Sequence, residues 1–325
     1  MGQVETFLGP VDPGHLGPTL IHEHIFVRDP ELELNALSPE WNETEAIDRA
    51  VRGLVALGEL GIRTLVDLTV LGLGRDVRLV AAVAARSPVH LVASTGVYAA
   101  EVLPLFFRFH GPGRLVGGPD PLVELMVRDI EEGIAGTPVK AGMLKVMSGP
   151  GRISEDAARV MSAAAIAHER TGVTITTHSE PARRNGLEQQ AYLRSRGVAL
   201  ERIVVGHSGD SDDLDYLCEL MDHGSTIGLD RFGMDHVLPE ERRVRTVLAL
   251  LERGYADRMV LSHDAAFFSH VTPPSWRASE APLWHMENIP RRILPMLRER
   301  GASDVQLEQM LVANPRRLLE RGARS

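Results

Sequence analysis

The sequence predicts an α/β fold, most simply a closed (β/α)8 TIM barrel that takes up residues 1–325 as one domain. One order of elements recurs along the chain: a helical pattern, a basic residue, a glycine and then a short β-branched run. Eight apolar runs of this kind are present, and no linker divides them. Continuously apolar strands indicate a parallel sheet covered by helices, and barrels of this kind routinely exceed 250 residues.

The eight predicted strands are the apolar, β-branched runs. They cover residues 19–25, 64–69, 90–96, 141–147, 173–179, 202–208, 225–230 and 258–264. Five glycines mark the helix ends that precede strands: Gly61, Gly172, Gly197, Gly224 and Gly254. Glycine suits the left-handed position just past a helix end, and a preceding Arg or His suits the negative end of the helix dipole.

Two helices are predicted together with their caps. Asn42 and Glu45 form a capping pair ahead of the first helix. The apolar residues of this helix recur at helical spacing: Ile47, Val51, Leu54, Val55 and Leu60. Ser154 is expected to cap the alanine-rich helix that runs to His168.

Two segments outside the eight predicted strands have distinct compositions. The first dozen residues contain Pro10, with Pro13 and Gly14 just beyond, and predict a short hairpin. Residues 265–289 are rich in Pro, Trp and Phe and predict a long loop after strand eight. A doubly wound open sheet is the alternative, but no G-x-G-x-x-G follows the first strand, and "LGLGRD" after the second lacks the third glycine.

Composition excludes several classes of partner. The formal net charge of −9 argues against nucleic acid or an anionic membrane surface, because phosphate binding needs clustered positive charge. The single cysteine, Cys218, excludes an intramolecular disulfide and is expected to be a small core residue. No basic region precedes an apolar run at the N-terminus, and no stretch approaches eighteen apolar residues, so we expect a soluble, cytoplasmic protein.

Polar side chains stand at the ends of five predicted strands. In "TLIHEHIF", strand alternation places His22 and His24 on one face and Glu23 on the other. The other strand-end residues are Lys145, His178, His207 and Asp264. The carboxyl ends of barrel strands meet at one rim, where barrel enzymes carry their chemistry. Four imidazoles and a carboxylate at one rim indicate a divalent-metal site for Zn²⁺, with Co²⁺, Fe²⁺ or Mn²⁺ as alternatives.

Lys145 is unusual, because Lys140 and Lys145 are the only lysines among 35 basic residues. A free ammonium is a poor neighbour for bound cations. It can act either as a Schiff-base nucleophile or as an amine that CO2 converts to a carbamate, which would bridge two metal ions. The four histidines favour the carbamate. His263 precedes Asp264 and is expected to face away from the site.

In their order along nearly the whole chain, these residues resemble the phosphotriesterase family of the amidohydrolase superfamily. The resemblance implies two metal ions. The more buried ion would be held by His22, His24 and Asp264. The more exposed ion would be held by His178 and His207, and carbamylated Lys145 with a hydroxide would bridge the two.

Within that family, "LTVLGLGRD", "STGVYA" and "GLDRFG" resemble the phosphotriesterase-like lactonases. The resemblance places Tyr98 beside the metals and the lactone ring, and it places Arg231 where the organophosphate hydrolases have a histidine. It also implies a homodimer and a hydrophobic channel that includes the last loop with Trp276. The expected substrate contacts are Phe26, Leu73, Tyr98, Arg231, Phe267 and Trp284.

The expected activity is the opening of acyl-homoserine or other γ- or δ-lactones, with weaker activity on phosphotriesters. Asp264 would carry the proton to the leaving alkoxide, and Tyr98 would stabilise the oxyanion. Arg231 would either contact the substrate or brace backbone carbonyls. A triesterase as the main activity is the alternative, and a Schiff-base aldolase on Lys145 is a third hypothesis. A small neutral substrate, without nucleic acid or membrane, fits an acidic protein with an apolar last loop, and signal quenching by lactone hydrolysis is one expected role.

Overall fold

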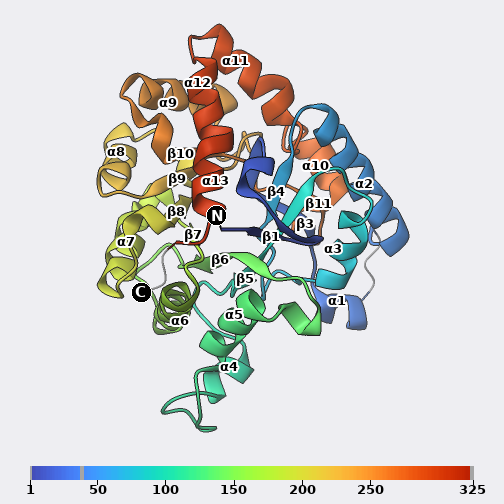
Figure 1. Ribbon diagram of the computed structural model, residues 1–325, viewed down its shortest axis with the longest axis vertical. Coiled ribbons are helices and arrows are strands. Elements are labelled where there is room, and N and C mark those ends of the chain that lie inside the picture. The colour runs from blue at the N-terminus through green and yellow to red at the C-terminus, as the bar shows by residue number, and fades with distance from the viewer. Residues whose placement is uncertain (1, 37–39, 323–325) are drawn as a thin grey trace.

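Parallel strands form the centre of the molecule and helices surround them (Figure 1). The computed structural model describes residues 2–36 and 40–322. All eight predicted strands are present, with somewhat shorter bounds for several of them. They are β3 (Thr19–Val27), β4 (Thr64–Asp67), β5 (His90–Gly96), β6 (Ala141–Met147), β7 (Ile175–His178), β8 (Ile203–Gly206), β9 (Thr226–Leu229) and β10 (Met259–Leu261).

The barrel closes through an eighth strand that is divided in two. β10 pairs in parallel with β9, whereas the short strand β11 (Ala266–Ser269) pairs in parallel with β3. Between the two halves, Asp264 N donates to His22 O at 3.0 Å and His24 N donates to Ala265 O at 2.8 Å. The (β/α)8 barrel is therefore confirmed.

The segment 265–289 follows the eighth strand as predicted, but it contains regular structure that the sequence analysis did not predict. It begins with β11 and continues into α10 (Pro274–Glu280). The free edge of β3 explains the difference, because its backbone groups need partners and the chain after β10 supplies them. The predicted N-terminal hairpin is present as β1 (Val4–Thr6) paired antiparallel with β2 (Gly9–Val11).

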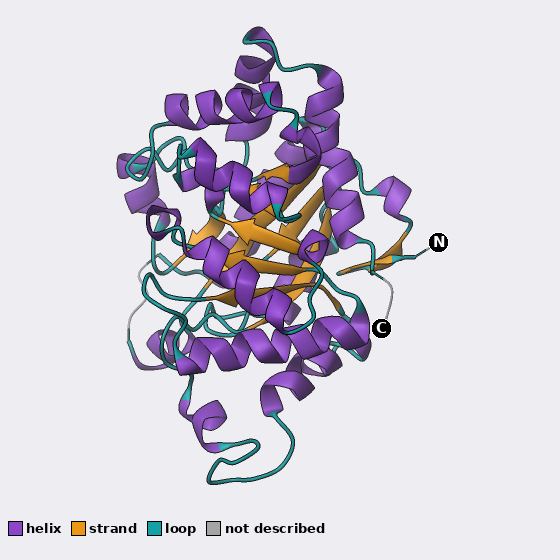
Figure 2. Ribbon diagram, turned by 90° about the vertical axis from the view of Figure 1, so that its left-hand side faces the viewer, coloured by secondary structure: helices purple, strands orange, loops and turns teal. Residues whose placement is uncertain are grey.

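Helices cover the outside of the barrel on all sides (Figure 2). They are α1 (Pro30–Asn35), α2 (Glu43–Glu59), α3 (Val77–Ala84), α4 (Leu105–Phe109), α5 (Pro121–Glu131), α6 (Glu155–Thr171), α7 (Asn185–Ser195), α8 (Leu214–Asp222), α9 (Glu240–Glu252), α10, α11 (Leu294–Glu299), α12 (Asp304–Glu308) and α13 (Asn314–Leu319). The predicted caps are present: Glu45 N donates to Asn42 Oδ1 at 3.1 Å, and Ala157 N donates to Ser154 Oγ at 3.1 Å. Gly172 ends α6 in the left-handed conformation.

The interior of the barrel is apolar at one end and polar at the other. Six strands contribute to a buried apolar cluster that also contains Val4 of the hairpin: Ile21, Val66, Val92, Met143, Val204 and Val260. The polar strand ends lie beyond this cluster, so the apolar layers support the site from below.

Two further expectations concern the rest of the chain. Cys218 is half-buried and packs against the core, and its Sγ accepts a hydrogen bond from Arg253 at 3.4 Å. Among the described residues, none of the helices has the length and apolar character needed to cross a membrane.

Candidate metal centre

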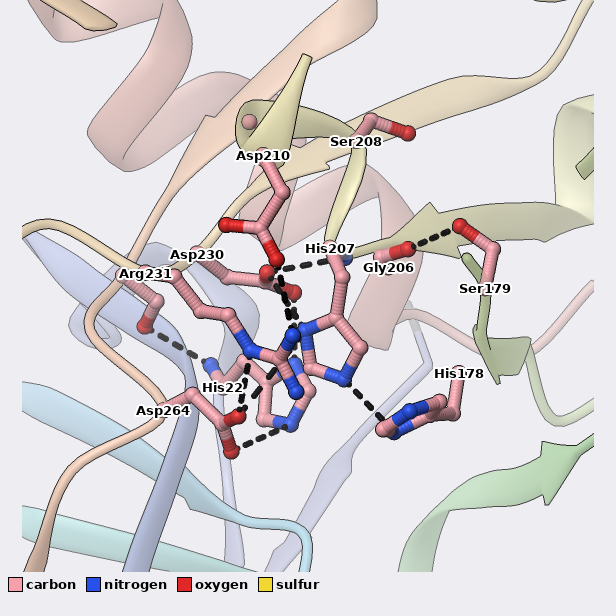
Figure 3. A network of polar contacts seen from close by, with 12 residues as sticks. His22, His178, Ser179, Gly206, His207, Ser208, Asp210, Asp230, Arg231 and Asp264 are labelled. Carbon is pink, nitrogen blue, oxygen red and sulfur yellow. Dashed lines mark hydrogen bonds and ion pairs between the residues drawn. The ribbon is translucent and has the colours of Figure 1, made fainter. Parts of the chain in front are cut away.

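The six residues predicted to bind metal all line one cavity of about 310 Å³. They come from five strands: His22 and His24 from β3, Lys145 from β6, His178 from β7, and His207 and Asp264 from the segments just after β8 and β10. Figure 3 shows four of them turned toward one another. The structure thus brings the predicted set together.

The candidate metal-binding atoms form two groups. In the first group, Asp264 Oδ1 lies 3.2 Å from His22 Nε2 and 3.0 Å from His24 Nε2. Lys145 Nζ lies 3.3 Å from the same His22 nitrogen. In the second group, His207 Nε2 lies 2.8 Å from His178 Nδ1. Nitrogen and carboxylate oxygen donors packed this closely fit zinc and similar divalent ions.

Asp230 orients one histidine from each group, and the sequence analysis missed it. Its Oδ2 accepts a hydrogen bond from His22 Nδ1 at 2.6 Å, and its Oδ1 accepts from His207 Nδ1 at 2.9 Å and from His207 N at 2.8 Å. With Nδ1 of each ring donating to Asp230, each Nε2 presents its lone pair to the cavity, as a metal ligand must. A carboxylate at the end of β9, within "GLDRFG", was the available signal.

Glycines make room for this carboxylate inside the barrel. A Cβ placed on Gly228 would lie 2.8 Å from Asp230 Oδ2, and a Cβ on Gly206 would lie 2.2 Å from Thr177 O. The Gly206 Cβ would also lie 3.3 Å from Asp230 Oδ2, so side chains at these two positions of β8 and β9 would crowd the carboxylate.

His24 has a separate orienting chain. Its Nδ1 donates to Thr69 Oγ1 at 2.9 Å, and the Thr69 hydroxyl donates to Asp67 Oδ1 at 2.5 Å. All three side chains are buried. The Nδ1 atoms of His22 and His24 are thus both oriented by a carboxylate. Asp230 binds His22 directly, and Asp67 acts on His24 through the Thr69 hydroxyl.

Two of the site residues occupy the left-handed backbone region. His207 has φ 61° and Asp264 has φ 54°. Residues other than glycine are uncommon there and cost of order 1–3 kcal/mol each when they adopt such conformations. Such residues cluster at functional sites, where the surrounding structure maintains them.

Burial favours the neutral imidazole at His178 and His207 and makes the neutral amine of Lys145 more accessible. Burial lowers the pKa of His178 to about 4 and lowers the pKa of His207 well below its usual value. For His22, burial opposes the charged form, but Asp230 and Asp264 outweigh it and raise the pKa. Burial also lowers the pKa of Lys145 to about 8, so a minor fraction of the amine is uncharged at neutral pH. Neutral imidazole is the form that binds metal.

Arg231 contacts carboxylates rather than backbone carbonyls. Its Nε donates to Asp264 Oδ2 at 3.0 Å and its Nη1 donates to Asp210 Oδ2 at 2.7 Å. Arg243 donates to the other Asp210 oxygen at 2.7 Å. Arg231 is therefore braced by two carboxylates while it lines the cavity (Figure 3).

Tyr98 lies beside the second group of ligands. Its ring packs edge-on against His178 with centroids 5.4 Å apart. Burial raises the pKa of Tyr98 to about 12, so its hydroxyl remains a hydrogen-bond donor at neutral pH. This position agrees with the expected place of Tyr98 at the cavity wall.

The expected substrate contacts divide into two sets. Leu73 and Trp284 line the cavity together with Tyr98 and Arg231. Phe26 and Phe267 do not line it, and these two expectations are corrected. Phe26 packs edge-on against Trp41, with centroids 5.6 Å apart, and the Phe267 ring lies against Gly53 of α2. Both rings bury apolar area between the strands and the helix layer instead.

The remaining wall of the cavity comes from residues that the sequence analysis did not name. Val27, Met234, Ala266 and Val271 contribute apolar surface. Trp276 of α10 does not line the cavity. Its ring packs edge-on against His236, with the ring centroids 5.9 Å apart. The cavity is thus a small apolar chamber above the polar ligand groups.

Comparison with known proteins agrees with this geometry. A model of the phosphotriesterase family matches residues 2–319. A relative from Mycobacterium tuberculosis named "Phosphotriesterase homology protein" is 44% identical and covers 99% of this chain and 98% of its own. An "Aryldialkylphosphatase" from Saccharolobus solfataricus is 36% identical over 94% of this chain and 96% of its own. A solved structure titled "Structure of the phosphotriesterase from Mycobacterium tuberculosis" superimposes with a TM-score of 0.95 at 42% identity and covers 98% of both chains.

Proposed function

The chain belongs to the phosphotriesterase family, a family of metal-dependent hydrolases, and on that premise we propose that it is a lactonase with a binuclear metal centre. Its main substrates would be acyl-homoserine lactones or other γ- and δ-lactones, with neutral phosphotriesters as a weaker activity. The observation that carries the proposal is a small apolar cavity whose wall includes Tyr98 and an Arg231 that is paired with two carboxylates.

The charges of the cavity favour a neutral substrate. Arg231 is paired with both Asp264 and Asp210, so it offers little unpaired charge to a phosphate dianion. Val27, Leu73 and Trp284 surround the space above the ligand groups and suit an alkyl or acyl group. A neutral ring with one carbonyl group and an apolar tail matches this chemistry.

The donor set fits two divalent ions, with Zn²⁺ favoured. His22, His24 and Asp264 would hold one ion, His178 and His207 would hold the other, and carbamylated Lys145 would be a ligand shared by both. When bound, the two ions supply a hydroxide nucleophile near neutral pH and polarise the carbonyl oxygen. We propose that Lys145 is carbamylated, because burial lowers its pKa to about 8 and the neutral amine is the form that reacts with CO2.

The chain's own residues handle the proton and the developing charge. Asp264 Oδ2, oriented by Arg231 Nε at 3.0 Å, accepts the proton of the attacking water and delivers it to the alkoxide that leaves as the ring opens. The Tyr98 hydroxyl donates to the carbonyl oxygen as that oxygen becomes an oxyanion. One water is consumed, and the product is a hydroxy acid.

Phosphotriester hydrolysis as the main activity is the second candidate. It is favoured by the similarity to a relative named "Aryldialkylphosphatase", and neutral triesters also suit an apolar cavity. The deciding experiment measures kcat/KM for acyl-homoserine lactones, simple lactones and a paraoxon-like triester on protein of measured metal content. We expect the highest value for a lactone. A higher value for the triester would reverse the assignment.

The Schiff-base aldolase is a third hypothesis that the same preparation can test. Lys145 Nζ lies 3.3 Å from His22 Nε2, among histidines rather than in a pocket of its own, which favours a role in the metal centre. Borohydride trapping of a carbonyl substrate on Lys145 would support the aldolase, whereas stoichiometric bound metal would contradict it.

The homodimer and the cellular role also remain proposals. Six large apolar side chains near α4, in the segment that projects from the barrel in Figure 2, are at least 45% exposed and offer a surface for a second copy: Val102, Leu105, Phe106, Phe109, Leu115 and Val116. Light scattering coupled to gel filtration tests this expectation. Hydrolysis of acyl-homoserine lactones would give the protein a role in quenching cell-to-cell signals.

A further inference from the structure

Glu23, the residue between the two histidines of β3, faces away from the cavity and is fully buried. Its carboxylate accepts four hydrogen bonds from residues 262–265. Oε1 accepts from Ser262 Oγ at 3.0 Å, His263 N at 2.8 Å and His263 Nδ1 at 2.6 Å, and Oε2 accepts from Ala265 N at 3.0 Å. One side chain of the first barrel strand therefore holds the end of the last one.

Asp264 lies in the middle of this segment, in the left-handed conformation at φ 54°. The amides on both sides of it, His263 N and Ala265 N, donate to Glu23, and its own amide donates to His22 O at 3.0 Å. Left-handed backbone costs a residue other than glycine roughly 1–2 kcal/mol. Three consecutive amides directed at residues 22 and 23 provide the interactions that maintain this conformation.

We infer that Glu23 is a positioning residue that fixes the backbone turn at Asp264 and thereby directs the Asp264 carboxylate toward His22 and His24. The inference rests on the proposed function only in taking Asp264 as a metal ligand. It explains why the eighth strand is divided between β10 and β11 at this residue, because the Glu23 carboxylate takes the place of a regular strand ladder there.

The same network reaches the wall of the cavity. Ile289 N donates to His263 Nε2 at 2.9 Å, so the ring hydrogen resides on Nδ1 and points to Glu23. Trp284 Nε1 donates to His263 O at 2.8 Å, and Trp284 lines the cavity. Glu23 therefore holds a metal ligand and an apolar wall residue through one buried turn, although it contacts neither the cavity nor Trp284 directly.

The test replaces Glu23 by glutamine in the zinc-loaded protein. Gln keeps the size of the side chain, but its amide nitrogen cannot accept the hydrogen bonds that one carboxylate oxygen now accepts. The measurements are the rate of zinc release to a chromogenic chelator and the Tm of the zinc-loaded protein. We expect Glu23→Gln to release zinc at least about tenfold faster than wild type, because loss of the hydrogen bonds that support a metal ligand costs about 10–100-fold in metal affinity.

Asp129→Asn is the matched control. Asp129 is also a fully buried carboxylate, but it accepts from Arg75 at 2.8 Å and Thr95 at 2.7 Å, away from the turn at Asp264. The control should lower Tm while its zinc-release rate stays within about twofold of wild type. Equal Tm losses with unequal release rates would separate positioning from general stability.

Ser262→Ala is the milder variant should Glu23→Gln fail to fold. It removes one of the four donors to Glu23, together with the acceptor of His22 N at 2.8 Å, and should accelerate zinc release by a smaller factor. Zinc release at the wild-type rate in the folded Glu23 variant, or in Ser262→Ala if that is the one that folds, would overturn the inference.

Wild-type protein that retains zinc but opens no lactone would contradict the proposed substrate and leave this comparison intact. Wild-type protein that binds no zinc would overturn the metal centre and this inference together.

Discussion

His22 donates through Nδ1 to Asp230 at 2.6 Å, deep inside the barrel and on the side of the ring away from the cavity. The other oxygen of the same carboxylate accepts a hydrogen bond from His207, so one side chain orients one histidine from each candidate group. Loss of this carboxylate, or of the groups around it, should therefore change zinc binding or catalysis.

Replacing Asp230 by asparagine should weaken zinc binding. The amide nitrogen of Asn cannot accept a hydrogen bond from an imidazole, so one of the two rings loses its orienting partner. Loss of such a partner costs about 10–100-fold in metal affinity, which a competitive zinc titration measures. Asp222→Asn at the surface, where the carboxylate accepts from Tyr255, is the control and should bind zinc like wild type. Unchanged zinc affinity in the Asp230 variant would contradict the orienting role.

Removal of metal should abolish activity, and its recovery should depend on CO2. The chelated protein should regain full activity with zinc and bicarbonate but only partial activity with zinc in CO2-free buffer, because the Lys145 carbamate must form from the neutral amine. Mass spectrometry of the intact protein under non-denaturing conditions would detect the adduct. Full recovery of activity without CO2 would contradict the carbamate but not the proposed histidine ligands.

Arg231→Lys tests bracing against direct substrate contact. A lysine keeps the charge but cannot hold Asp264 and Asp210 at once as the guanidinium does. We expect kcat to fall by about tenfold or more with KM nearly unchanged, since Asp264 would lose its orientation. Steady-state kinetics on one lactone separates the two parameters. A rise in KM with an unchanged kcat would instead show that Arg231 binds substrate.

Tyr98→Phe should impair lactone opening while leaving the metal centre loaded. The phenyl ring keeps the packing against His178, so only the hydroxyl donor is lost. One neutral hydrogen bond of about 1.4 kcal/mol corresponds to about a tenfold loss in kcat/KM. Zinc content should match wild type and serves as the control. A variant with wild-type kcat/KM would remove Tyr98 from the oxyanion role.

Stability should fall in mild acid, in part through His168. Its Nδ1 donates to Val173 O at 2.8 Å, and burial lowers its pKa below the usual 6.5. The unfolded chain therefore takes up a proton that the folded chain resists. This contribution to stability is complete above about pH 6.5 and declines as pH falls toward the lowered pKa. Urea midpoints at pH 7.5 and pH 5 should differ less for His168→Gln than for wild type. An equal difference in both proteins would show that other groups dominate.

The sequence by itself determined the barrel and the six candidate metal-binding residues that the structure brings to one cavity. Strand alternation placed His22 and His24 on one face. Because the carboxyl ends of barrel strands meet at one rim, the strand-end residues Lys145, His178, His207 and Asp264 were predicted to lie near them. Both signals are local, because each depends on the residue type and its place in one strand.

The tertiary structure alone decided the supporting contacts and the cavity wall. Asp230, Glu23 and Thr69 act on residues from other strands, so their roles depend on how the barrel closes and not on any local pattern. Phe26 and Phe267 were expected at the cavity, but aromatic packing between strand and helix layers draws them away. The pairing of β11 with β3 could not be predicted either. It depends on which edge of β3 lacks a partner, and only the closed sheet as a whole determines that.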